Sequence, residues 1–313
     1  MPLGDGNKDM DSRAPLAASV HAASTALRRY RPVKWRYASP IILVHLIALL
    51  ACLPWFFSWT GVVLAVLSIY VFGTLGMAVG YHRLLTHRSF SCARWMERSL
   101  AILGVCCGQE SPTVWVAWHR RHHHVADQEE DPHSPIRSFL WGHIGWLVFK
   151  SPNAEVGPLI ERYAPDLYKD AFYARLEVAD NWVKVALLSW LLYFMIGFVA
   201  ESFSGGSTMD SIQFGLSLIV WGAAVRTVFV WHVTWSVNSI THLWGYRNFD
   251  TPDGSRNNVL IGLLAMGEGW HNNHHAYPNS ARHGHSWREP DVAWLTIRTL
   301  LALGLARDVK RYR

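Results

Sequence analysis

Residues 61–87 read GVVLAVLSIYVFGTLGMAVGYHRLLTH, an apolar run that leads directly into two histidines. Positions 61–80 carry no Asp, Glu, Lys or Arg, and about 20 apolar residues are enough for a helix to cross the hydrocarbon layer of a membrane. This stretch predicts a membrane-spanning helix that continues beyond the lipid and presents His82 just past its apolar part.

Three further apolar blocks have a similar length, at 41–59, 182–200 and 212–231. Short breaks at Gly61 and at 202–211 join the four blocks in pairs, which predicts two membrane hairpins. We therefore expect an all-α membrane protein with four transmembrane helices in two hairpins and a cytoplasmic helical cap that carries a di-metal site. The cap is expected to comprise 81–181 and 232–313. Residues 1–38 are expected to form a disordered, basic N-terminal tail, and 39–313 a single membrane domain.

The basic residues predict the orientation of the spans. The connections inside the two hairpins contain no Lys or Arg, whereas the segment before the first span, the 81–181 region and the C-terminal tail are basic. Because Lys and Arg favour the cytoplasmic side, both termini and 81–181 are expected in the cytoplasm. The net charge of +6 is explained by these membrane flanks, so we expect no nucleic-acid partner.

Histidines form three clusters, and all three fall on that same predicted side. In an H-x-x-H-H pattern on a helix, the three rings lie within an arc of about 100°. Neutral imidazole is the commonest metal ligand, and eight imidazoles exceed what one four-coordinate zinc ion can use. The pattern therefore predicts a dinuclear site with nitrogen ligands. The eight residues are His82, His87, His119, His122, His123, His271, His274 and His275.

The first cluster differs from the other two in its spacing. His82 and His87 are five residues apart, which separates them by about 140° on a regular α-helix. They can share a site only if the helix ends between them, or if each serves a different metal.

Other polar residues near the clusters are weaker candidates. His242 is the best ninth ligand, and Asn238 lies four residues before it on the same helical face, where it could hold a metal-bound water. His124 lies about 140° from His119 and is a poorer ligand. The carboxylates of 127–131 could orient the ligand imidazoles or could form an ordinary acidic loop. The remaining histidines carry no metal-binding spacing: His232 is expected to be structural, and His283 and His285 to lie on the surface.

Taken in order, H-R-L-L-T-H-R (82–88), H-R-R-H-H (119–123), D-P-H (131–133), N-S-x-x-H (238–242) and G-E-G-W-H-N-N-H-H (267–275) resemble the integral-membrane fatty acyl desaturases of the stearoyl (Δ9) type. The resemblance extends over about 41–310. It implies a centre of two iron ions that uses O2 as co-substrate and two electrons to introduce a cis double bond into a saturated acyl chain. It also implies that the nine histidines named above bind the iron ions, with Asn238 bound through water.

The resemblance further implies a bent substrate tunnel beneath the metals. The positions that match the bend are Gln109, Trp115 and Thr234, with Trp235 beside them. Tyr70 matches the closed end of the tunnel, and Thr74 lies one helical turn away. Of the residues that hold a CoA headgroup in the vertebrate enzymes, Arg121 and Lys150 match, whereas Glu110, Val114, Trp118 and Phe149 do not. The carrier of the acyl chain is therefore left open between CoA, acyl-carrier protein and a glycerolipid.

The chain contains no G-x-G-x-x-G turn for a dinucleotide and no cysteine set for an iron–sulfur cluster. We therefore expect an external electron donor, either a ferredoxin or a cytochrome b-type protein with its reductase. The expected location is a bacterial inner membrane. A membrane di-iron hydroxylase of the same histidine-box superfamily is the alternative enzyme, since both would share the oxidant. A divalent metal transporter is the alternative of another class, but transport sites place polar residues inside the spans, and these spans have almost none.

Overall fold

The computed structural model describes residues 32–151 and 155–312, so most of the predicted N-terminal tail lies outside the described residues. Almost all regular structure in this part of the chain is helical, and one two-stranded antiparallel sheet pairs β1 with β2. The elements that form the long helices are α2 (Trp35–Leu49), η1 (Leu50–Cys52), α3 (Trp59–Ser68), η3 (Ile69–Thr86), α10 (Asn181–Phe203), α11 (Thr208–Leu218), η6 (Ile219–Val225) and α12 (Arg226–Leu243), and η2 (Pro54–Phe56) lies in the turn between the first two long helices.

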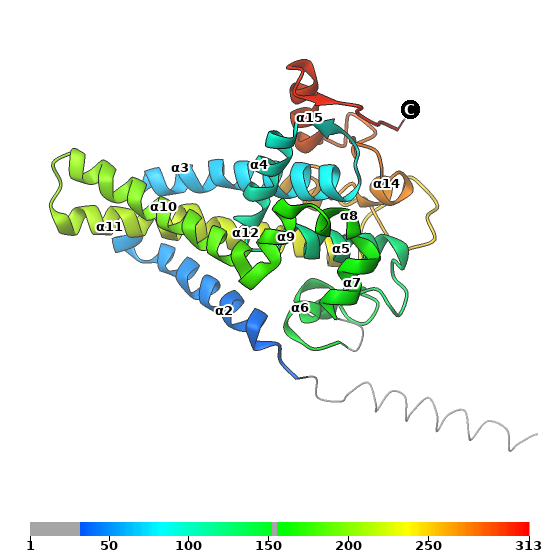
Figure 1. Ribbon diagram of the computed structural model, residues 1–313, viewed down its shortest axis with the longest axis horizontal. Coiled ribbons are helices and arrows are strands. Elements are labelled where there is room, and N and C mark those ends of the chain that lie inside the picture. The colour runs from blue at the N-terminus through cyan, green and yellow to red at the C-terminus, as the bar shows by residue number, and fades with distance from the viewer. Residues whose placement is uncertain (1–31, 152–154, 313) are drawn as a thin grey trace, which may run out of the picture.

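The remaining elements are shorter. They are β1 (Ser91–Cys92), α4 (Arg94–Val105), α5 (Pro112–His124), η4 (Trp141–Gly145), α6 (Trp146–Val148), α7 (Val156–Tyr163), α8 (Pro165–Tyr168), α9 (Ala171–Glu177), η5 (Val178–Asp180), α13 (Val259–Leu264), α14 (His271–Ala276), α15 (Val292–Ala302) and β2 (Ala306–Arg307). Of these, α9 and η5 run directly into α10, and the others belong to the cap. Figure 1 shows the long helices extending to one side, whereas α5 to α9, α14 and α15 gather at the other end.

Among the described residues, four helices are long and apolar enough to cross a membrane. They are Trp35–Cys52, Trp59–Thr86, Ala171–Phe203 and Thr208–Leu243. The four predicted spans lie largely within these helices, and the protein is an all-α membrane protein with the expected two hairpins. Only 6% of the first helix is buried inside the protein, against 61% of an apolar 18-residue stretch of the fourth. The first helix therefore lies at the periphery of the bundle, and the fourth at its centre.

The first hairpin turns earlier than predicted. The first helix begins at Trp35 and ends at Cys52, because Pro54 cannot donate a backbone hydrogen bond to continue it. The second helix begins at Trp59, where the Ser58 side chain caps it by accepting a hydrogen bond from the Gly61 amide. Gly61 is therefore not the break between the spans. A Cβ atom there would lie 2.8 Å from the Trp221 ring, so glycine permits this close helix contact.

The second helix changes its winding before it reaches the first histidines. From Ile69 to Thr86 it is a π-helix, with i→i+5 hydrogen bonds. The His87 amide continues this pattern by donating to the His82 carbonyl at 3.1 Å. Residues five apart are nearly one turn apart in this winding, so His82 and His87 come to the same side. The α-helical angle that separated them in the sequence prediction does not apply.

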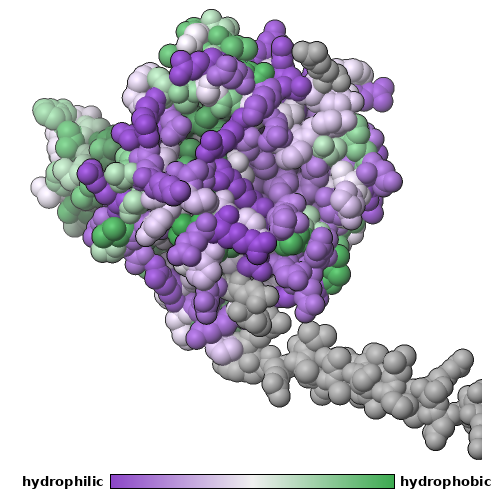
Figure 2. Space-filling view, turned by 45° about the vertical axis from the view of Figure 1, so that its right-hand side comes forward, coloured by the Kyte–Doolittle hydropathy of each residue, from purple (hydrophilic) through white to green (hydrophobic). Residues whose placement is uncertain are grey.

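The core of the cap packs directly on the end of the second helix. Tyr81 and Leu85 of η3 are buried with Val105 of α4 and Val114 of α5 in one apolar cluster. Figure 2 shows a broad hydrophilic surface over this end of the molecule, while hydrophobic side chains gather toward the long helices. This division matches a bundle that lies in lipid and a cap that faces water.

Candidate metal centre and substrate cavities

The nine histidines predicted as ligands converge in two adjacent groups. In each group every residue offers one nitrogen, and these nitrogens lie within 4.8 Å of one another. Seven of the nine are buried, and His123 and His275 are partly buried. The first group is His82, His87, His119, His123 and His274, and the second is His122, His242, His271 and His275.

Four separate elements bring these rings together. The end of η3 supplies the first pair, α5 supplies three, the end of α12 supplies His242, and the short helix α14 supplies three. Helix α5 starts at a Ser111 cap, whose side chain accepts from the Val114 amide, and Pro112 occupies its first position. On α14, Asn273 anchors the helix through its side chain, which contacts Asn257 at 2.8 Å and the carbonyl of His283 at 2.8 Å.

Carboxylates hold the outer nitrogens of four ligand candidates. Nδ1 of His122 lies 3.0 Å from Asp131, Nδ1 of His242 lies 2.8 Å from Asp127, and Nδ1 of His275 lies 2.8 Å from Asp253. Nδ1 of His82 is bonded to Glu268 in the same way. The residues in these four pairs are distant in sequence except for His122 and Asp131. Within 127–131, Asp127 and Asp131 thus lie where they orient ligand imidazoles, whereas Glu129 and Glu130 are exposed.

This arrangement leaves the inner nitrogens as bare acceptors. A neutral imidazole that donates from Nδ1 to a carboxylate has an unprotonated Nε2. His122 and His275 are both held in this way, yet their Nε2 atoms lie only 3.3 Å apart. In two further pairs one of the rings is held in this way: Nε2 of His242 lies 3.0 Å from Nε2 of His271, and Nε2 of His82 lies 3.1 Å from Nε2 of His274. Lone pairs that face one another at this distance repel unless a cation lies between them, so the donor set fits metal ions.

Burial keeps most of these rings in the ligand form. Burial, reinforced by the neighbouring histidines, holds the pKa values of His119, His123 and His274 well below the ordinary value. Burial also lowers the pKa of His275 to about 4, although Asp253 opposes this shift. These imidazoles are therefore neutral near pH 7, which is the form that binds metal.

Glu268 links the first group to a buried arginine. The Arg83 side chain is completely buried and donates to Glu268 at 2.8 Å and to Asp291 at 2.9 Å. Burial would raise the pKa of Glu268, but Arg83 and His82 lower it below the ordinary range. A Cβ atom at Gly267, where φ is +117°, would lie 2.3 Å from Asp291. Glycine therefore permits the turn that points Glu268 toward His82.

Sequence reasoning missed Glu268, Asp253 and His283 as parts of the site. His283 was expected on the surface, but it is 1% exposed and lies beside Arg83 and His274. Its alternation with His285 in a glycine-containing loop gave no sign of this burial. His124, by contrast, is exposed and belongs to neither group.

Three further histidines lie outside both groups. The His232 ring contacts His45 and His143, each through nitrogens 3.0 Å apart, and His143 also contacts Ser239 at 3.0 Å. They form a chain of hydrogen bonds across α2, η4 and α12, which agrees with the structural role expected for His232.

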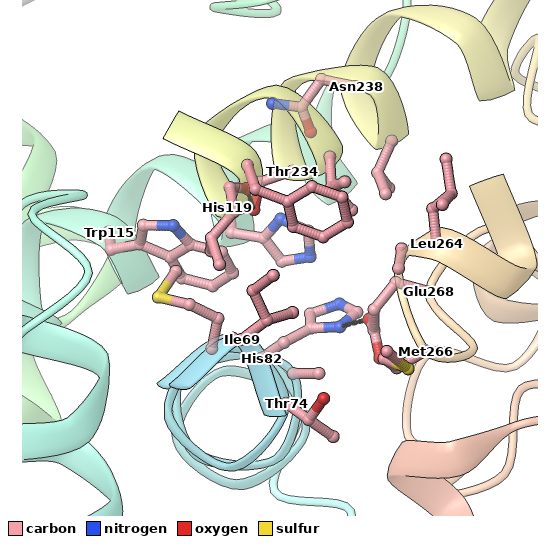
Figure 3. Close-up of a pocket in the computed structure, with 18 residues that line it drawn as sticks. Ile69, Thr74, His82, Trp115, His119, Thr234, Asn238, Leu264, Met266 and Glu268 are labelled. Carbon is pink, nitrogen blue, oxygen red and sulfur yellow. Dashed lines mark hydrogen bonds and ion pairs between the residues drawn. The ribbon is translucent and has the colours of Figure 1, made fainter. Parts of the chain in front are cut away.

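Two cavities meet beside the metal groups. The larger has a volume of about 520 Å³ and the smaller about 70 Å³. Trp115, His119, Thr234 and Asn238 line both of them. Figure 3 shows the smaller cavity between η3, which carries Thr74, and α12, which carries Thr234 and Asn238. A chain that passes from one cavity into the other would therefore run alongside the ligand histidines.

Several residues predicted at the tunnel lie at these cavities. Gln109 and Trp235 line the larger cavity and Thr74 lines the smaller. The Gln109 amide donates to the Thr234 hydroxyl at 3.1 Å, and this hydrogen bond joins the two sides of the predicted bend. The Trp115 ring stacks on His119 with centroids 5.1 Å apart.

The other predicted substrate residues lie outside the cavity walls. Tyr70 is bonded through its hydroxyl to Thr296 at 2.9 Å and does not line either cavity. Arg121 lies over the Trp118 ring, and Lys150 is exposed, with its amide bonded to the Pro32 carbonyl. Neither residue lines either cavity.

Comparison with known proteins agrees with this arrangement. The fatty acid desaturase family matches residues 57–298. The chain is 42% identical over 267 residues to the sn-1 stearoyl-lipid 9-desaturase of Synechocystis, covering 85% of this chain and 77% of that protein. It is 40% identical over 266 residues to the sn-2 palmitoyl-lipid 9-desaturase of Nostoc, covering 85% and 86% of the two chains. It is also 38% identical over 284 residues to the icosanoyl-CoA 5-desaturase of Limnanthes douglasii, covering 90% and 74%.

The match extends over most of the chain and includes all three histidine clusters. This protein belongs to the fatty acid desaturase family and is a membrane enzyme that desaturates fatty acyl chains.

Proposed function

We propose that this enzyme holds two iron ions and uses O2 to introduce a cis double bond at the Δ9 position of a saturated acyl chain. The observation that carries the proposal is the pair of histidine groups at the junction of the two cavities. Δ9 regiochemistry is supported by the names of the two cyanobacterial relatives. The groups lie at the end of the spans that the basic residues predict to be cytoplasmic.

Imidazole suits iron, and nine histidine nitrogens form a set that two metal ions can share. The first group offers five nitrogens and the second four. Asn238, which lines both cavities, would hold a water as the further ligand of the second ion. When bound, the two iron ions would supply the oxidising power to remove two hydrogens from the acyl chain. These hydrogens, together with two external electrons and two protons, would reduce O2 to two water molecules.

The protein's own residues would hold and orient the acyl chain. Trp115 would cover one side of the chain where the two cavities meet, and its stacking on His119 fixes the ring. The Gln109–Thr234 hydrogen bond would hold the wall of the bend at the carbons that react. Thr74, buried in the smaller cavity, would limit the length of chain beyond the bend. The bend and the closed end of the smaller cavity together would determine which pair of acyl carbons faces the metals.

The electrons would come from a separate protein, a ferredoxin or a cytochrome b-type protein with its reductase, at the hydrophilic face of the cap. A direct test is expression in a host without a desaturase of its own, with double-bond location in the extracted lipids by mass spectrometry. Metal analysis of the purified protein accompanies it. The expected result is two iron ions per chain and Δ9 monounsaturated products. An iron-free protein, or a hydroxylated product, would contradict the proposal.

A further inference from the structure

The larger cavity separates the first membrane helix from the third. Its walls include Pro40, Ile41 and Val44 of α2 on one side and Ala186, Leu187 and Trp190 of α10 on the other. Helix α2 packs against η6, α12 and α6, and Figure 1 shows it slanting away from α10. The cavity therefore lies between these two helices.

This cavity reaches the outer surface between the two helices. Leu187 is 61% exposed and also lines the cavity, and Pro40 on the opposite wall is exposed as well. Both residues belong to helices that are long and apolar enough to cross a membrane. An opening with apolar edges between two such helices faces the acyl chains of the bilayer.

The charged rim of the cavity is balanced. Four charged side chains line it: Lys34, Arg36, Glu110 and Asp180. The Lys34 ammonium donates to the Trp146 carbonyl at 3.0 Å, and Arg36 is paired with Asp180. Phosphate groups are commonly bound by Arg and Lys side chains, and the described residues of this rim give no excess of positive charge.

We infer that the substrate is an acyl chain of a bilayer glycerolipid, which enters sideways between α2 and α10 while its headgroup stays at the rim. The inference rests on the proposed function and names its substrate class. The chain end would move past Leu187 and Trp190 to the junction at Trp115 and then into the smaller cavity. The ester and headgroup would remain near Arg36.

The Arg36–Asp180 pair closes the rim of this opening. It joins the start of α2 to the start of α10, and its side chains are 65% and 49% exposed. An exposed ion pair of this kind contributes little to stability. The pair can therefore open without disturbing the fold, and it serves as a latch on the opening.

The test compares two adjacent leucines on α10. Leu187 lines the cavity, whereas Leu188 is 63% exposed and does not. Full-length, iron-loaded Leu187→Trp and Leu188→Trp are placed in vesicles that contain a diacyl glycerolipid with a photoactivatable group in one acyl chain. We expect Leu187→Trp to reduce labelling of the cavity walls and turnover of the vesicle lipid at least 10-fold, and Leu188→Trp to leave both near wild type.

Two further arms separate the alternatives. Arg36→Asp is expected to increase the rate of wall labelling, and the exchange Arg36→Asp with Asp180→Arg to restore it. Acyl-CoA added in water is expected to be a poor substrate. Equal behaviour of the two tryptophan variants, or labelling by acyl-CoA alone, would overturn the inference. If no acyl substrate is desaturated while the lipid still labels the cavity walls, the proposed function fails and the lipid site stands.

Discussion

Replacing Asp253 with Asn should weaken metal binding without unfolding the protein. One oxygen of Asp253 accepts from Nδ1 of His275 at 2.8 Å. The other accepts from the Ser255 amide at 2.9 Å and from the Thr251 hydroxyl at 3.0 Å. An asparagine has only one acceptor oxygen, so it can satisfy one of these two sides. If its NH2 group faces His275, the ring proton moves to Nε2 and the lone pair that points at the metal is lost.

The size of the effect follows from this loss. Removing a carboxylate that orients a ligand histidine lowers metal affinity about 10- to 100-fold, which corresponds to about 1.4 to 2.7 kcal/mol. The matched control is Asp250→Asn. Asp250 lies on the same loop, but it is fully exposed, and its one ion pair among the described residues is with Arg247, at 3.8 Å.

The assay measures iron retained by purified Asp253→Asn and Asp250→Asn after equilibration against a series of chelator concentrations. Thermal unfolding of the metal-free proteins shows whether both remain folded. We expect the retention curve of Asp253→Asn to shift by 10- to 100-fold and that of Asp250→Asn to match wild type. Coincident curves for two folded variants would refute the role given to Asp253.

Three further predictions concern the ligands, the tunnel end and pH. His123→Ala should lose iron and activity while still inserting into membranes, whereas His124→Ala, which removes an exposed ring from the same cluster, should keep both; iron and product analysis of the two variants checks this. Thr74→Leu should shift the products toward shorter acyl chains and Thr74→Ala toward longer ones, because Thr74 lines the smaller cavity; an unchanged chain-length profile in both would contradict the assignment. Because burial lowers the pKa of His275 to about 4, the unfolded chain binds a proton below about pH 6.5 that the folded, metal-free chain does not. The free energy of unfolding of the metal-free form should therefore fall as the pH is lowered from 6.5 to 4, by about 1.4 kcal/mol per pH unit for this residue. His275→Gln should reduce this slope when unfolding is measured as a function of pH.

The sequence could predict the spans and the histidine groups because both depend on local patterns. An apolar run of sufficient length predicts a membrane helix wherever it packs, and H-x-x-H-H brings three rings to one face of any α-helix. The His82–His87 pair shows where this reasoning stops. Their common side depends on π-helical winding, which the α-helical period does not predict.

The partners of the ligands could not be predicted because they come from distant loops. Asp253 lies 22 residues before His275, and its position depends on the path of the loop. Glu268 reaches His82 through a turn that Gly267 permits, and it is held there by Arg83, 185 residues away. His283 was assigned to the surface for the same reason, since only the fold shows that it packs against Arg83.

The geometry of the two groups also connects metal binding to the stability of the cap. His122 and His275 point bare nitrogens at each other across 3.3 Å, and their carboxylate partners prevent either ring from turning away without losing a buried hydrogen bond. Burial lowers the pKa of His275, whereas Asp131 raises the pKa of His122. In the metal-free protein, a proton on His122 or a movement of the backbone that carries the rings can relieve this repulsion. That backbone is α14, a helix of six residues, whereas α5 is anchored in the apolar core through Val114 and Val116. Metal ions therefore stabilise the position of α14 more than that of α5.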